Sequence, residues 1–350
     1  MTVPGEVTAA SRSVSPGAEA GNPTPEAADE HRPPAAAPAA DRDHRRRRGG
    51  QGAGGATVLD ACAAAGKDVP TLCYGDTLTP KNACRVCVVE VEGSRTLAPA
   101  CSRRAEPGMA VGTATERARH SRKVVLELLA SSTDLSTTPR AAEWIAEYGA
   151  RPERFGPDAA SVAQPPKVDN DLYVRDYAKC ILCYKCVDAC GDQWQNTFAI
   201  AVAGRGFDAT ISTEHDAPLT DSACVYCGNC VEVCPTGALS FKTEFDMRAA
   251  GEWDESRQSR TTTICSYCGV GCNLTLHVQD NRIVKVGSPH DNPVTHGNLC
   301  IKGRFGYQHV QNVPRAEPTV LSSADLLDPA GPAWGPSSAS SAGGAAPSDG

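Results

Sequence analysis

"CILCYKCVDAC", residues 180–190, and "CVYCGNCVEVCP", residues 224–235, decide the fold of this chain. Both stretches have the spacing C-x2-C-x2-C-x3-C, and Pro235 follows the last cysteine of the second one. Two residues between cysteines allow three thiolates and the intervening backbone N–H groups to wrap one face of a cube-shaped metal–sulfide cluster. Two full copies therefore predict a domain built around two such clusters.

The spacing resembles that of bacterial two-cluster ferredoxins, in which the fourth cysteine of each run binds the other cluster. The resemblance implies two [4Fe-4S] ligand sets: set A is Cys180, Cys183, Cys186 and Cys234, and set B is Cys224, Cys227, Cys230 and Cys190. A pair of zinc knuckles is the alternative interpretation. Between the two runs, "FDATIST" (207–213) alternates as a strand does, which predicts an extended form of the fold.

A cysteine group nearer the start has the spacing C-x10-C-x2-C-x13-C: Cys73, Cys84, Cys87 and Cys101. The preceding "ATVLDACAAAGKDVP" (56–70) predicts a helix, and "CVVEVEGSRTLAPA" (87–100) predicts a hairpin turning at "EGSR". The run "CYGD…ACRVCVVEVEG…PAC" resembles the N-terminal [2Fe-2S] domain of the complex I large subunit and of NAD-linked molybdenum formate dehydrogenases. This implies a β-grasp domain with these cysteines as the [2Fe-2S] set. Structural zinc is the alternative, and Cys62, on the apolar helix face, is predicted to be a buried structural thiol.

The next segment lacks a feature that the resembled family has. There, a further [4Fe-4S] cluster is held by one histidine and three cysteines, but "HSRKVVLELLASSTDLSTTPRAAEWIAEYG" (120–149) contains no cysteine. Ser132 and Ser136 stand at the expected histidine and first cysteine. We expect instead two amphipathic helices, at about 116–130 and 140–148, with Pro139 opening the second and His120 as an ordinary surface residue.

The last cysteine group has a different spacing, C-x2-C-x3-C-x27-C, and is called set C: Cys265, Cys268, Cys272 and Cys300. Within it, "NLTLHVQDNRIVKVG" (273–287) predicts a strand pair turning at Asp280 and Asn281. Set C resembles the N-terminal [4Fe-4S] subdomain of the molybdenum bis-pterin oxidoreductases, including formate dehydrogenase. In that family a lysine two residues after the last cysteine lies between cluster and pterin, so the resemblance implies a relay role for Lys302. The alternative is a solvated lysine.

Composition limits the remaining possibilities. Aromatic residues make up 5% of the 350 residues, and 17 cysteines stand beside 26 prolines and 32 glycines, which favours small modules over one large core. A net charge of −7 argues against a nucleic-acid binder, and the basic run 45–48 is interpreted as solvated. The absence of an apolar stretch long enough for a signal peptide or a membrane span predicts a cytoplasmic protein without a transmembrane segment, in which grouped thiols favour metal binding over disulfides.

Together these features predict an α+β chain of small iron–sulfur modules with disordered ends. The expected divisions are 1–55 disordered, 56–105 [2Fe-2S] domain, 106–167 helical segment and linker, 168–246 two-[4Fe-4S] ferredoxin domain, 260–312 molybdopterin-oxidoreductase-type [4Fe-4S] subdomain, and 313–350 disordered tail.

The resemblance implies the electron-transfer part of a formate dehydrogenase alpha subunit, which passes electrons from formate to NAD through flavin- and NAD-binding partner subunits. The 50 residues after Cys300 are too few for the domain that binds molybdenum-bis(molybdopterin guanine dinucleotide), so we expect that domain to be missing and the chain alone not to be catalytically competent. We also expect both ends to be foreign to the family, as in a frame-shifted or truncated gene. A subunit related to complex I or a hydrogenase, and a stand-alone ferredoxin-like carrier, are the alternatives.

Overall fold

The computed structural model describes residues 6–8 and 55–312, and all 17 cysteines lie in the second of these ranges. Most of the predicted disordered start, and the predicted disordered tail from residue 313, lie outside the described residues. Three residues of the start are described. Glu6–Thr8 form strand β1, which pairs antiparallel with β4, with Val7 opposite Val111. An extended segment with β-branched Val7 and Thr8 can satisfy the free backbone edge of β4.

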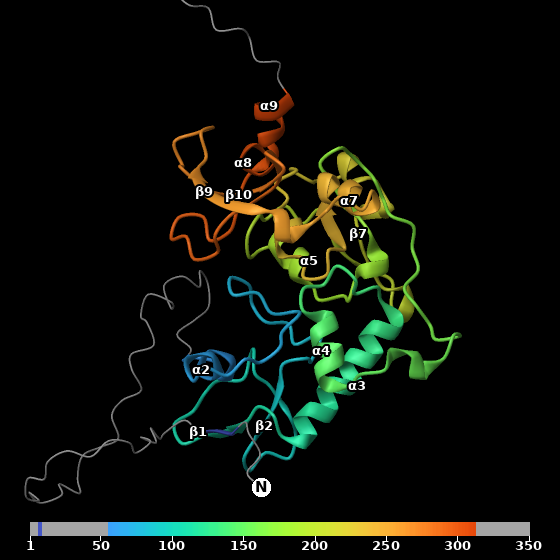
Figure 1. Cartoon of the computed structure of the whole chain (residues 1–350), viewed down its shortest axis with the longest axis vertical. Helices are drawn as coiled ribbons and strands as arrows, with labels where there is room; N and C mark the ends of the chain where they lie inside the picture. Colours follow the sequence, from blue (N-terminus) through green and yellow to red (C-terminus); the bar gives the residue numbers. More distant parts are fainter. Residues whose placement is uncertain (1–5, 9–54, 313–350) are drawn as a thin grey trace, which may run out of the picture. The chain divides into compact units, whose positions relative to one another are not determined.

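The first module is a four-stranded sheet with one helix against it (Figure 1). The sheet order is β1, β4 (Ala110–Gly112), β2 (Val88–Val91) and β3 (Ala98–Pro99). β2 and β3 pair with Val88 opposite Pro99, which confirms the predicted hairpin. Helix α2 (Val58–Ala64) begins with a capping box in which Thr57 and Asp60 bond each other's backbone N–H groups. Its buried Val58 and Cys62 face the core, as predicted.

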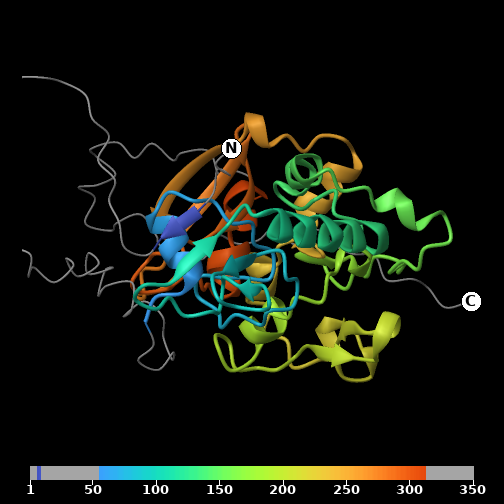
Figure 2. The ribbon, with the colours of Figure 1, turned by 90° about the horizontal axis from the view of Figure 1, so that it is seen from below.

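Two helices follow where the family has its histidine-ligated cluster. They are α3 (Glu116–Ser132) and α4 (Ala141–Tyr148), close to the predicted bounds, and they lie side by side (Figures 1 and 2). His120 is exposed on α3, as predicted. Pro139 does not open α4, because the helix begins at Ala141 with Arg140 as its N-cap, and Pro139 lies one residue before that cap. Arg122 of α3 is buried and donates to the Val88 carbonyl at 2.8 Å, so the helix is fixed to β2.

The next module has two short helices that each follow a cysteine loop: α5 (Lys185–Cys190) and α6 (Asn229–Val233), which pack on each other. Beside them β5 (Tyr173–Arg175) pairs antiparallel with β8 (Leu239–Phe241). The predicted strand in 207–213 is present as β7 (Thr210–Ser212), which pairs with β6 (Ala201–Ala203). Helix α7 (Lys242–Ala249) continues directly from β8.

The last described module is a three-stranded antiparallel sheet of order β11-β10-β9, followed by two short helices. Its elements are β9 (Ser259–Ile264), β10 (Asn273–Gln279), β11 (Arg282–Gly287), α8 (Ile301–Phe305) and α9 (Tyr307–Asn312). Asp280 and Asn281 join β10 to β11 with φ of 51° and 62°, as the predicted turn requires.

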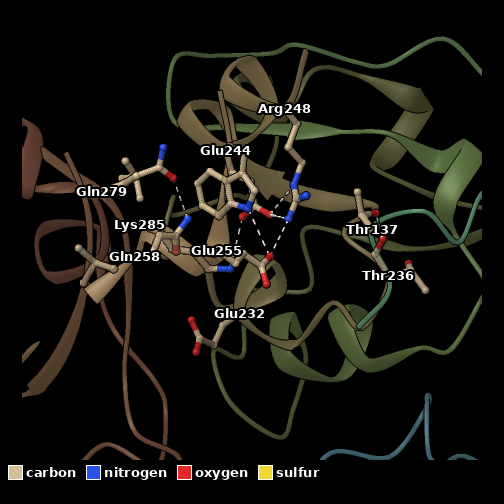
Figure 3. A network of polar contacts seen from close by, with 12 residues as sticks. Thr137, Glu232, Thr236, Glu244, Arg248, Glu255, Gln258, Gln279 and Lys285 are labelled. Atoms are coloured by element: carbon tan, nitrogen blue, oxygen red, sulfur yellow. Dashed lines mark hydrogen bonds and ion pairs between the residues drawn. The ribbon is translucent and has the colours of Figure 1, made fainter. Parts of the chain in front are cut away.

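A polar network attaches this sheet to α7 (Figure 3). Glu244 of α7 pairs with Arg248 at 2.8 Å and with Lys285 of β11 at 3.4 Å. Arg248 also pairs with Glu255 at 3.0 Å. The fold is thus the predicted α+β assembly of small modules, and none of the helices in the described ranges is long and apolar enough to cross a bilayer.

Candidate iron–sulfur centres

The two ferredoxin-type loops share one backbone conformation. Leu182 and Tyr226, each two residues after a first cysteine, have φ of 51° and 56°, and Tyr184 and Gly228 follow with φ of 67° and 70°. These left-handed turns point backbone N–H groups inward, so that Leu182 donates to Cys180 Sγ and Tyr226 to Cys224 Sγ, both at 3.4 Å. Each loop is thus shaped to present thiolates together with N–H groups to one point.

Set A surrounds an apolar cavity. Its four cysteines line that cavity together with Tyr177, Ile211 and Leu239, although Cys234 comes from the other run. Burial first and the neighbouring Cys234 sulfur next raise the pKa of the Cys180 thiol to about 11 and that of Cys183 to about 12, and burial also raises the pKa of Cys186. Four thiols around one apolar space fit a [4Fe-4S] cluster.

Set B is assembled in the same way from the opposite runs. Burial raises the pKa of Cys230, and the next causes are the nearby sulfurs of Cys227, Cys224 and Cys190. Cys190 ends α5, whereas the other three belong to the loop before and the start of α6. These neighbours are compatible with the crossed pattern that the ferredoxin resemblance implies, and the assignment of each cysteine stays a prediction.

The [2Fe-2S] set forms two pairs of sulfurs. A hydrogen bond from the Cys73 thiol is the main cause that lowers the pKa of Cys84 to about 6, and the bond from Cys101 does the same for Cys87, to about 7. The backbone N–H groups of Cys73 and Cys84 each donate to the other's sulfur at 3.4 Å. All four side chains are buried. Two thiol pairs side by side provide two ligands for each iron of a [2Fe-2S] cluster.

Set C also comes together, but nearer to solvent. The pKa of Cys272 is raised by burial and then by the sulfurs of Cys265, Cys300 and Cys268. Cys265 is buried, whereas Cys268 and Cys300 are exposed. No three metal-ligating side chains in residues 6–8 and 55–312 converge as the ligands of a single ion do. The thiols of set A instead line a larger space.

The modules share apolar packing. Cys73 and Cys84 belong to one hydrophobic cluster with Cys183 of set A, together with Leu72 and Trp144. On the other side, Phe305 of α8 packs into the ferredoxin core, 5.5 Å from the Phe241 ring between centroids. One hydrophobic cluster is thus shared by the [2Fe-2S] set and set A, and another is shared by the ferredoxin core and α8.

Arg304 joins set C to set B, and sequence analysis did not identify it. Its side chain is fully buried, donates to the Cys227 carbonyl at 3.2 Å, and forms an ion pair with Glu232. Gly228 makes room for it, because a Cβ there would lie 2.6 Å from Arg304 Cδ. A glycine inside a C-x2-C-x2-C loop and an arginine two residues after Lys302 were the only signals for this contact, and neither is specific.

A second contact, also missed, connects three modules through His290. Its Nδ1 lies 2.9 Å from Asp76 and its Nε2 3.7 Å from Glu232. Hydrogen bonds to these two carboxylates raise the pKa of His290 to about 9, while Arg304 and then His290 hold that of Glu232 near 2 against the effect of burial. At neutral pH the imidazolium therefore bridges two anions.

Three other residues named in the sequence analysis, Lys302, Cys62 and Ser132, lie outside the four cysteine sets. Lys302 is exposed and lines an open pocket with Tyr267, Phe305 and His309 beside set C. Cys62 is 1% exposed, which confirms a buried thiol. Ser132 donates to the Leu128 carbonyl at 2.9 Å at the end of α3 and so serves the helix terminus.

Three protein-family models match the chain in succession. They are a 2Fe-2S iron-sulfur cluster binding domain at residues 49–116, a 4Fe-4S dicluster domain at 179–238, and a molybdopterin oxidoreductase Fe4S4 domain at 258–312. The structure thus contains [2Fe-2S] and [4Fe-4S] cluster-binding domains, and these matches displace the zinc alternatives.

Several relatives share this arrangement. An NADH-quinone oxidoreductase subunit of Rhizobium meliloti is 32% identical over 79% of this chain and 32% of its own length. The alpha subunit of an NADPH-Fe(3+) oxidoreductase of Geobacter sulfurreducens is 35% identical over 75% of this chain and 31% of its own. A protein provisionally named formate dehydrogenase in Staphylococcus haemolyticus is 26% identical over 75% and 30%. The chain therefore spans about a third of the length of these relatives.

Among solved structures, the NAD+-reducing [NiFe]-hydrogenase in its H2-reduced state is similar, with a TM-score of 0.47 and 26% identity over 55% of this chain and 83% of that one. From the family models and the sequence relatives, residues 49–312 are an iron–sulfur region of the type found in molybdopterin oxidoreductases. The same region occurs in the NADH-quinone oxidoreductase relative, which is a complex I-type protein, and in formate dehydrogenase-like alpha subunits.

Proposed function

We propose that this chain transfers electrons through one [2Fe-2S] and three [4Fe-4S] clusters, held by the four cysteine sets defined above. The observation that carries the proposal is that Cys180, Cys183 and Cys186 line one apolar cavity together with Cys234 of the other run. The neighbouring sulfurs in the other groups support the same interpretation. Thiolates in such sets are the ligands of iron–sulfur clusters, which hold and release single electrons. The proposed cluster-binding domains have the limits that the sequence predicts.

The contacts between neighbouring cysteine sets support an order in which electrons pass from one cluster to the next. Set C contacts set B through Arg304 and Phe305, sets A and B adjoin, and set A packs against the [2Fe-2S] set through Cys183. Electrons that enter at set C therefore leave at the [2Fe-2S] set, or travel in reverse. The exposed Cys268 and Cys300 of set C make that end of the path accessible.

We further propose that the path belongs to a formate dehydrogenase alpha subunit, with flavin- and NAD-binding partner subunits in the cytoplasm. The set C domain match supports this, and Lys302 would lie between set C and a bound pterin of the molybdenum cofactor. A second candidate is the large subunit of an NAD(P)H-linked oxidoreductase, which the higher identity of the NADH and NADPH relatives favours, 32% and 35% against 26%.

The ligand sets are tested by replacing one cysteine at a time in the anaerobically purified chain. Under the crossed assignment, Cys180→Ser and Cys234→Ser disturb the same [4Fe-4S] signal in electron paramagnetic resonance (EPR) spectra, and Cys190→Ser disturbs a different one. If Cys180→Ser and Cys190→Ser disturb the same signal, the crossed assignment is wrong. Cys62→Ser is the matched control, because this buried thiol lies outside all four sets.

The electron donor is tested with the same preparation, mixed with cell extract from which endogenous small molecules have been removed. Reduction of the clusters by formate but not by NADH or NADPH supports the formate dehydrogenase assignment. Reduction by NADH or NADPH alone supports the second candidate. Dithionite reduces the clusters in either case, which separates a missing partner from missing clusters.

A further inference from the structure

Sets A and B come from the same motif, yet they receive different hydrogen bonds from side chains. The Tyr173 hydroxyl lies 3.3 Å from Cys224 Sγ, and the Thr197 hydroxyl lies 3.3 Å from Cys190 Sγ. Both sulfurs belong to set B. On the set A side, the Thr236 hydroxyl lies 3.9 Å from Cys234 Sγ, near the limit for a sulfur hydrogen bond. The backbone N–H bonds inside the two loops are equal, at 3.4 Å, and set A receives one more, from Leu239 to Cys234 Sγ at 3.4 Å.

The direction of these bonds is fixed once the sulfurs bind iron. A ligating thiolate carries no proton, so it can only accept. The Tyr173 hydroxyl therefore donates to Cys224 Sγ. The Thr197 hydroxyl lies 3.3 Å from both Cys190 Sγ and the Cys190 carbonyl, so its one proton is shared between these two acceptors. Tyr173 is 2% exposed, which leaves no solvent to compete for its bond.

The charged surroundings differ in the same sense. Buried Arg304 donates to the carbonyl of Cys227, a set B residue, at 3.2 Å, which places its positive charge beside set B. Glu232 offsets part of that charge through its ion pair with Arg304. Set A instead lies around a cavity with a mainly apolar lining. The cation that acts on Cys183 of set A is the half-exposed Lys185.

A reduced cluster carries one more negative charge than an oxidised one, mostly on its sulfurs. A donor that points at a ligating sulfur stabilises the reduced form more, and the reduction potential rises. We propose, on the basis of the function proposed above, that Tyr173 and Thr197 hold the potential of the set B cluster above that of the set A cluster. An electron that reaches this domain then rests on the set B cluster first.

The test is a potentiometric titration of the full, anaerobically purified chain with dithionite, followed by low-temperature EPR. Tyr173→Phe and Thr197→Val each delete one hydroxyl. Both shift the midpoint of the same [4Fe-4S] component to more negative potential, and in the unmodified chain that component has the higher midpoint of the two ferredoxin-type signals. The double variant shifts it further than either single one.

Tyr307→Phe is the matched control. Tyr307 is also a buried tyrosine, but its hydroxyl lies 3.2 Å from the Thr243 hydroxyl instead of a thiol. It therefore removes a buried hydroxyl at similar structural cost and leaves the set B midpoint unchanged.

Three outcomes overturn the inference. Tyr173→Phe and Thr197→Val shift the midpoints of different components, they shift no midpoint, or the component that they shift is the one with the lower midpoint potential. Iron and sulfide analysis of each variant keeps this separate from the proposed function. A chain with its clusters intact and no shift contradicts only the role of the hydroxyls, whereas a chain without two ferredoxin-type signals contradicts the cluster assignment itself.

Discussion

At the residue scale, the buried charge of Arg304 connects several segments of the chain. Its guanidinium bonds the carbonyls of Cys227, Val286 and Gly297 at 3.2–3.3 Å and the Asn229 side chain at 3.1 Å, and it pairs with Glu232. These partners come from α6, β11 and the loop before α8. The residue therefore holds set B and set C together, and its charge is matched by an almost buried carboxylate.

We expect Arg304→Met to destabilise the protein by about 3–5 kcal/mol, because it leaves Glu232 without its main cation in a buried site. Heating scans that follow the visible cluster absorbance measure the effect. The matched control is Arg248→Met, whose ion pairs with Glu244 and Glu255 are partly exposed and contribute about 1 kcal/mol or less. Equal midpoints for the two variants would show that Arg304 is not a structural clamp.

His290 makes one contact between modules sensitive to pH. Because its pKa is raised from 6.5 to about 9, the stabilisation is fully present below pH 6.5 and is lost as the pH rises through 9. The charged groups that face it are Asp76 and Glu232, with Arg304 beyond Glu232. After allowance for solvent at the half-exposed ring, the contribution is on the order of 1–2 kcal/mol.

We therefore expect the difference in unfolding midpoint between the unmodified chain and His290→Gln to be largest near pH 6 and to shrink by pH 10. Thermal scans at a series of pH values, at constant ionic strength, measure it. His120→Gln, on the exposed face of α3, is the control and should show no such step. A difference that is constant, or that grows with pH, contradicts the bridging role.

At the scale of elements, the sequence predicted the hairpins and helices well because their signals are local. Asp280 and Asn281 provide the positive φ that the turn of β10 and β11 needs, and the apolar spacing of α2 matches its buried face. Strand β1 was missed because its partner β4 lies about a hundred residues away, and three extended residues carry no pattern of their own.

The capping box of α2 is a local contact whose loss should weaken the [2Fe-2S] module. Thr57 accepts from the Asp60 N–H at 3.1 Å, and Asp60 accepts from the Thr57 N–H at 2.8 Å. Thr57→Ala should cost about 1 kcal/mol, since both helix-start bonds depend on this arrangement. Loss of [2Fe-2S] visible circular dichroism on heating measures it. Thr57→Ser should restore most of the stability, and Thr262→Ala on exposed β9 should have no effect; a similar loss in all three would refute the cap.

At the scale of the whole molecule, cysteine spacing predicted which thiols lie together, because short x2 and x3 steps fix loop geometry and the distant fourth ligand follows the ferredoxin pattern. It could not predict what surrounds each set. Tyr173 and Cys224 are 51 residues apart in sequence, and Arg304 and Cys227 are 77 apart, so only folding brings them together. The assignment of each cysteine to a cluster stays a prediction, as do the domain limits.

The central claim is that sixteen cysteines hold four iron–sulfur clusters, and a metal and sulfide analysis of the anaerobically purified chain tests it most directly. The account predicts about fourteen iron atoms and as many acid-labile sulfides per chain, with one [2Fe-2S] and three [4Fe-4S] signals on stepwise reduction. A chain with about two or four iron atoms, or one that contains zinc and no labile sulfide, would contradict it.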